Sequence, residues 1–139
     1  MKFQNVMVIA GLVLSTSAHA QGIDFQLAKM KSGNFKCEVF FNVTNNSGLN
    51  ITGGNADISS REKDGSIISK DNLFFRRIKK GESEVVQSFV GDKDCSPIKT
   101  LQLQLFSVEV DGDRILSGSV LSKVNDGKKS SSVPGVVVK

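Results

Sequence analysis

Two stretches of the chain alternate apolar and polar side chains with a period of two, and this pattern decides the fold class. Every second residue from Cys37 to Val43 is apolar, and Leu101, Leu103 and Leu105 alternate with glutamines. Successive side chains of a β-strand point to opposite faces, so each stretch predicts a strand with one buried face. Because no segment shows a convincing helical period, the sequence predicts an all-β protein.

Further strands are expected where such runs lie between turn signals rich in glycine, asparagine and aspartate. The expected strands are Ile23–Met30, Phe35–Thr44, Leu49–Arg61, Ser66–Ser69, Asn72–Ile78, Ser83–Val90, Ile98–Val110 and Arg114–Val124. Gly53-Gly54 predicts a bulge in the third of them. About seven short strands at regular spacing predict a two-sheet β-sandwich that spans residues 21–124.

The last residues, 125–139, are rich in lysine, serine and glycine. This composition predicts a flexible C-terminal tail. The three valines Val136–Val138 leave an alternative open, because they are apolar enough to dock or to add a strand.

The first twenty residues have the pattern of a cleaved secretory signal peptide. Lys2 supplies the positive charge, Val6–Leu14 forms an apolar run, and Ala18-His19-Ala20 matches the small-x-small cleavage motif. The alternative of a membrane anchor fails on length, because a spanning helix needs about 20 apolar residues. Cleavage after Ala20 predicts a periplasmic or secreted protein.

Cleavage also removes His19, the only histidine of the chain, and the remainder contains neither tryptophan nor tyrosine. Catalysis by Ser-His-Asp or Cys-His groups and histidine-containing metal sites are thereby excluded. Two pairs of carboxylates remain, Asp92 with Asp94 and Asp111 with Asp113, and both lie in turns where aspartate caps its own backbone. The sequence therefore predicts a protein that is not an enzyme, with no catalytic residue, metal or cofactor.

The two cysteines of the chain, Cys37 and Cys95, are expected to form a disulfide, since exported proteins oxidise their thiols. The alternative is a zinc site, which would need carboxylates as its remaining ligands.

Three segments together resemble the immunoglobulin-like and fibronectin type III-like domains of bacterial envelope proteins. They are CEVFFNVTNNSG (37–48), EKDGSII (62–68) and IKKGES (78–83). The likeness extends from Phe35 to about Val124 and implies an Ig-like sandwich. The chain departs from antibody-type domains in three respects: it has no tryptophan to pack on the disulfide, no tyrosine corner, and a cysteine, Cys95, that precedes its strand. Relatives of this kind serve as periplasmic chaperones, secretion accessories or host-interaction modules.

The stretch FFRRIKKGE, Phe74 to Glu82, is the candidate partner-binding segment, because two aromatics adjoin four cations. The cationic residues are Arg76, Arg77, Lys79 and Lys80. Binders of single-stranded nucleic acid interleave aromatics and cations in this way. Strand alternation, however, divides the aromatics and arginines between two faces. The stretch is therefore interpreted first as a strand and turn with one phenylalanine in the core, second as a cationic rim for an anionic protein or lipid surface, and last as a nucleic-acid site.

The leading hypothesis is a non-enzymatic, exported protein-binding module that acts through a sheet edge or loop surface, either chaperone-like or directed at a host protein. Its partner is another protein, and a homodimer formed by strand exchange or edge pairing is a further possibility. The alternative is a module that binds a polyanion or a lipid surface through the basic segment.

Overall fold

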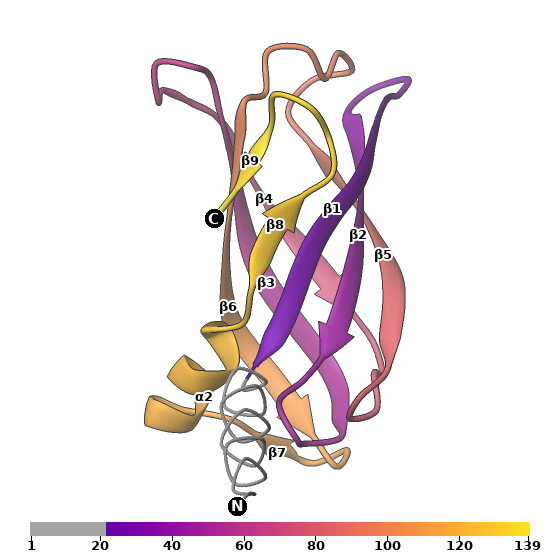
Figure 1. Cartoon of the computed structure of the whole chain (residues 1–139), viewed down its shortest axis with the longest axis vertical. Helices are drawn as coiled ribbons and strands as arrows, with labels where there is room; N and C mark the ends of the chain where they lie inside the picture. Colours follow the sequence, from indigo (N-terminus) through magenta and orange to yellow (C-terminus); the bar gives the residue numbers. More distant parts are fainter. Residues whose placement is uncertain (1–21) are drawn as a thin grey trace, which may run out of the picture.

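The computed structural model describes residues 22–139, so the predicted signal peptide and Gln21 lie outside the described residues. The alternating stretches form the central strands of two sheets that pack face to face (Figure 1). The first sheet has the order β5-β2-β1-β8, with strands β5 (Ser83–Val90), β2 (Cys37–Asn45), β1 (Ile23–Ser32) and β8 (Lys129–Ser131). The second has the order β4-β3-β6-β7, with strands β4 (Ile67–Phe75), β3 (Ile51–Arg61), β6 (Thr100–Val110) and β7 (Arg114–Ile115); β9 (Val137–Val138) also pairs with β6. The predicted two-sheet β-sandwich is confirmed.

The core lies between the sheets and follows the predicted alternation. Every odd-numbered residue of β2 is buried, as are Leu101, Leu103 and Leu105 of β6. Beyond Leu105 the burial moves to Val108 and Val110, because the register of β6 against β3 shifts at this point. Three phenylalanines join the sheets edge to face: the ring of Phe25 lies 6.3 Å from that of Phe41 and 6.2 Å from that of Phe75.

The predicted disulfide is present. Cys37 is the first residue of β2, and Cys95 lies in the loop that carries the chain from β5 in one sheet to β6 in the other. Their Cα atoms are 5.1 Å apart. The bond therefore ties a central strand of the first sheet to the crossover into the second.

Two expectations for the C-terminal third are wrong. The strand expected over Arg114–Val124 is shortened to β7, and the chain then forms a helix, α2 (Gly118–Asn125), which buries Val124 against the sandwich. Residues 125–139 are not a free tail, since they contribute β8 to the first sheet and β9 to the second. The alternative of an added strand at the terminal valines is confirmed, and Val138 is buried. Among the described residues, no helix has the length and apolar character needed to span a membrane.

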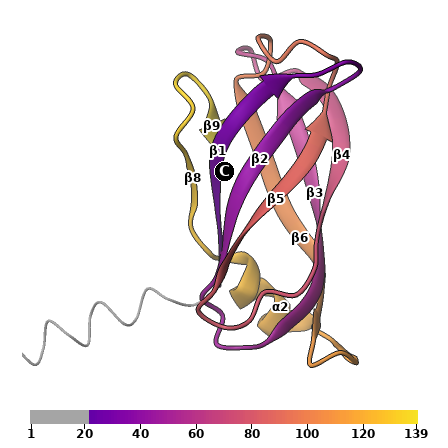
Figure 2. The same ribbon diagram turned by 90° about the vertical axis from the view of Figure 1, so that its right-hand side faces the viewer.

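This C-terminal segment closes one side of the sandwich. Next to β1, the amide of Phe25 donates to the Lys128 carbonyl and the amide of Ser132 donates to the Leu27 carbonyl, both at 2.8 Å. Figure 2 shows β8 and β9 on one side of the sandwich and β4 on the other.

The outer edge of β6 is covered in the same way along its length. The amide of Leu103 donates to the carbonyl of Lys139, and that of Leu105 donates to the Asn125 side chain at the end of α2. Further along, the amide of Leu116 donates to the Val108 carbonyl. The main-chain groups at the edges of both sheets are thus hydrogen-bonded by the C-terminal segment on this side, a usual protection against unwanted strand pairing.

Candidate binding surface at the β4–β5 side

The opposite side of the sandwich is formed by β4 and β5, the edge strands of the two sheets. The amide of Asn45 donates to the carbonyl of Glu82, so this pair belongs to the hydrogen-bonded positions of the β2–β5 ladder. Hydrogen-bonded and non-hydrogen-bonded positions alternate along an antiparallel pair, so the even-numbered residues of β5 bond to β2. The main-chain groups of Val85, Gln87 and Phe89 therefore point away from β2, toward the open side.

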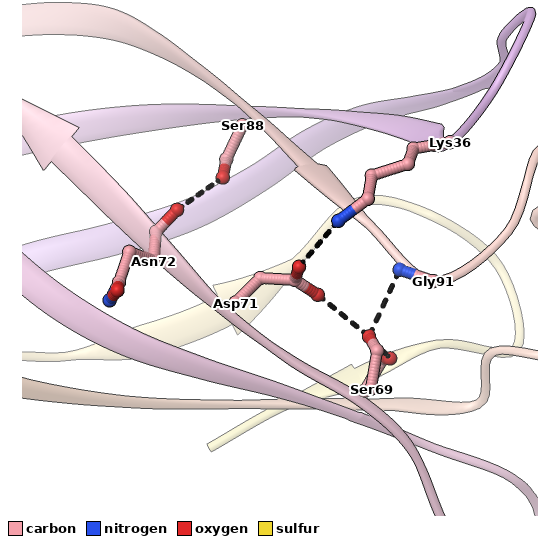
Figure 3. Close-up of polar contacts among 7 residues, drawn as sticks. Lys36, Ser69, Asp71, Asn72, Ser88 and Gly91 are labelled. Atoms are coloured by element: carbon pink, nitrogen blue, oxygen red, sulfur yellow. Dashed lines mark hydrogen bonds and ion pairs between the residues drawn. The ribbon is translucent and has the colours of Figure 1, made fainter.

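A polar seam joins β4 to β5 near the end that carries the disulfide (Figure 3). The Ser88 hydroxyl donates to the carbonyl of Asn72 at 2.8 Å, and the Gly91 amide donates to Ser69 Oγ at 2.9 Å. Side-chain hydrogen bonds thus replace a main-chain ladder here. The bond to Asn72 also shows that the carbonyl of this residue, and by alternation that of Phe74, points toward the open side.

An ion pair completes the seam. Lys36 Nζ lies 2.8 Å from Asp71 Oδ1, and the other oxygen of this carboxylate accepts from Ser69 Oγ at 2.7 Å. Asp71 is largely buried and Lys36 is half-exposed. The carboxylate therefore links the β1–β2 loop to β4 and holds the two sheets together at this end.

Beyond the seam the two strands diverge, and a hollow of about 270 Å³ opens between the end of β4 and the start of β5. It is lined by the buried Phe75 and Ile78 and the half-buried Val86, together with the polar side chains of Arg76, Arg77, Glu84 and Gln87. Two exposed apolar side chains stand at its rim: Phe74 is 65% exposed and Val85 is 67% exposed. Large apolar groups exposed together in this way mark a contact surface.

The same apolar character continues along the seam. Phe89 lines a hollow with Phe74, and a further one with Phe35 of the β1–β2 loop. Sequence reasoning missed Phe35, Val85 and Phe89 as site residues. A signal was present in Ser83–Val90, where apolar residues occupy both faces of the strand, with Val86 and Val90 inward and Val85 and Phe89 outward.

The predicted basic segment lies at the open end of this surface. Arg76, Arg77, Lys79 and Lys80 are all exposed and follow β4 rather than extending it. Strand alternation therefore stops at Phe75, and Phe75 and Ile78 are both buried although they were expected on opposite faces. Of the four cations, only Arg76 and Arg77 line the hollow between β4 and β5. Arg77 also lines a second hollow of about 500 Å³, together with Lys79 and Asp111. Among residues 22–139, none of the four cations forms an ion pair within 4 Å.

Of the two predicted carboxylate pairs in the described chain, only Asp94 caps its own turn through its side chain. The backbone amide of Ser96 donates to the Asp94 carboxylate at 3.0 Å and its hydroxyl does so at 2.9 Å, and these bonds lower the pKa of Asp94 below its ordinary value. Asp64 has a lowered pKa for the same reason, with the Ser66 hydroxyl as the main donor. Within the described chain, no three histidine, cysteine or acidic side chains converge as metal ligands.

No protein-family model matches the chain, and no curated protein matches it. Among solved structures it is similar to one described as the structural characterization of IrmA from Escherichia coli. The match has 12% sequence identity and a TM-score of 0.55, and it covers 81% of this chain and 92% of that one. At this identity the likeness establishes a shared fold, and the chain is accordingly a β-sandwich protein with the same general architecture as a bacterial one.

Proposed function

We propose that the protein is an exported, non-enzymatic binding module that recognises another protein through the β4–β5 side. One observation carries the proposal: the C-terminal segment occupies the strand edges on one side of the sandwich, whereas on the other side exposed apolar side chains lie beside strand edges that no further strand covers. Sheet edges bind extended polypeptides through main-chain hydrogen bonds and need no special side-chain chemistry.

The expected export is supported by the disulfide, which persists in oxidising compartments. The strand order supports the expected Ig-like or fibronectin type III-like topology. β5-β2-β1 face β4-β3-β6-β7, which corresponds to the E-B-A strands of an Ig-like sandwich facing the C′-C-F-G strands. Such a fold serves many functions, so the proposal rests on the surface and not on the topology.

Site-specific photo-crosslinking tests the proposal. A photoreactive residue replaces Val85 on the open side or, as a matched control, Val137 on the closed side, where the native valine is 56% exposed. Each protein is expressed in its native organism, and crosslinks are sought in the periplasmic and secreted fractions. We expect a specific protein adduct from position 85 and none from position 137. The same adduct from both positions, or from position 137 alone, contradicts the proposal.

A second candidate function is binding to a polyanion or an anionic lipid surface. It is favoured by the four exposed cations of the basic segment, which form no ion pair within the described chain. Glu84 and Asp111 beside the arginines and lysines reduce the local positive charge. Salt separates the two functions, because apolar edge recognition survives an increase in ionic strength whereas polyanion binding weakens steeply.

A further inference from the structure

The hollow at the diverging ends of β4 and β5 indicates what kind of polypeptide the open side accepts. We infer that it takes an extended, acidic segment of the partner, which adds as a strand to β5, places an apolar side chain in the hollow and sets a carboxylate against Arg76 and Arg77. This inference rests on the proposed function and specifies its partner.

The main-chain groups define where a strand can add. At the seam, β4 is joined to β5 by Ser88 and by the amide of Gly91, which leaves no room for a further strand between them. Past the seam, the amides and carbonyls of Val85 and Gln87 face the hollow from β5, and the amide and carbonyl of Phe74 face it from β4. A short extended segment therefore finds hydrogen-bonding partners only at this end of the side.

The hollow determines which side chains of such a strand are apolar. In a strand paired with β5, residues opposite Val85 and Gln87 point to the outer face, and the residue opposite Val86 points inward. The inward position lies over Phe75 and Ile78, the buried apolar side chains that line the hollow. A volume of about 270 Å³ is below the roughly 300–1,000 Å³ of small-molecule pockets, so it suits an inserted side chain.

The charged residues around the hollow determine which side chain the partner carries next to its apolar one. Arg76 and Arg77 line the hollow, and neither is within 4 Å of a carboxylate of the described chain. Guanidinium groups bind carboxylates through paired, charge-assisted hydrogen bonds. The seam contacts of Ser69 with Gly91 and of Asn72 with Ser88 place residue 76 level with Glu84. An antiparallel partner, the more stable pairing, runs in the direction opposite to β5. Its acidic residue beside Arg76 therefore lies C-terminal to its apolar residue opposite Val86.

Glu84 opposes this arrangement and so provides a sign-specific test. Its carboxylate lines the same hollow and repels an incoming acidic side chain. Glu84→Gln is expected to strengthen binding of acidic segments, whereas loss of the arginines is expected to weaken it. A merely structural effect of these exposed residues would not give opposite signs.

The experiment is a selection from a random peptide display library on the immobilised protein without residues 1–20. We expect enrichment of extended sequences with an apolar residue followed within two positions by Asp or Glu. Arg76→Glu with Arg77→Glu is expected to shift the preference to basic residues. The matched charge change Lys79→Glu with Lys80→Glu should leave the acidic preference intact. A synthetic winning peptide should bind about ten-fold more weakly after its acidic residue is replaced by the corresponding amide.

Two further variants distinguish failure of the inference from failure of the proposed function. If selected peptides lose binding on Val85→Lys and keep it on Val137→Lys but show no acidic preference, the inference is wrong and the proposed function stands. If the selected peptides are insensitive to Val85→Lys, both are wrong. A selection that enriches no sequence also overturns the inference.

Discussion

Gly54 of β3 lies directly under the ring of Phe75, and this close approach predicts a large difference between two adjacent glycines. A Cβ atom added at Gly54 would overlap the tip and both edges of that ring. A Cβ atom at Gly53 would meet only the Phe75 carbonyl oxygen, at 3.9 Å, which is an ordinary contact. The pair therefore gives a test variant, Gly54→Ala, and a matched control, Gly53→Ala.

The magnitude follows from two opposing effects. Replacing a glycine by alanine stabilises a protein by about 0.4–1 kcal/mol through the unfolded chain, where the native conformation allows it. At Gly54 the ring must move, although its edge-to-face contact with Phe25 fixes it within the core. Overpacking of this kind costs about 1–3 kcal/mol. We expect Gly54→Ala to lower the free energy of unfolding by about 1–2 kcal/mol and Gly53→Ala to leave it unchanged or slightly raised.

The assay is urea unfolding of the protein without residues 1–20, followed by far-ultraviolet circular dichroism, since this chain has neither tryptophan nor tyrosine for fluorescence. With slopes of about 1–3 kcal/mol/M, the two variants should differ by roughly 1 M in midpoint. Because Phe75 also lines the hollow, Gly54→Ala should weaken partner binding as well. Equal midpoints for the two variants would refute the packing of Phe75 on Gly54.

Three further predictions concern the disulfide, a turn carboxylate and the closed side. Replacing Cys37 and Cys95 by serine removes a crosslink between residues 58 apart and should lower the free energy of urea unfolding by about 4 kcal/mol; an unchanged midpoint contradicts this. Asp94 has a lowered pKa because Ser96 donates to it, so its stabilising contribution is complete above its ordinary pKa of 3.8 and is lost as the pH falls through the lowered value. NMR titration should show that Ser96→Ala raises this pKa, and no change would exclude the serine as its cause. Truncation after Asn125 uncovers the edges of β1 and β6 and should produce oligomers by light scattering, whereas a stable monomer would show that these edges need no cover.

The sandwich and its disulfide were predictable because they follow from local patterns. The alternation of β2 and β6 needs no knowledge of their neighbours, and two cysteines permit only one pairing. Helix α2 was missed although Leu116, Val120, Leu121 and Val124 have helical spacing. A helix of only about two turns does not stand out from a strand in the sequence pattern, and it is the packing of Val124 against the sandwich that favours the helix.

The candidate surface was only half predictable. The basic segment is visible in the sequence, but the end of β4 at Phe75 depends on how the chain pairs with β3, which it meets again at the Ile51–Ile78 bridge. The exposure of Val85 and Phe89 depends on β5 being an edge strand, which is a property of the strand order and not of the strand itself. The docking of Val137–Val138 is likewise decided by the free edge of β6.

Hydrogen exchange of the β5 amides tests the central claim most directly. In the free protein, the amides of Val85 and Gln87 should exchange quickly while those of Val86 and Ser88 are protected by the ladder to β2. When the crosslinked partner protein or a selected peptide is bound, Val85 and Gln87 should become protected, with no change in β8 or β9. Protection that appears at β8 and β9 and leaves Val85 and Gln87 unchanged would contradict the assignment of the β4–β5 side as the binding surface.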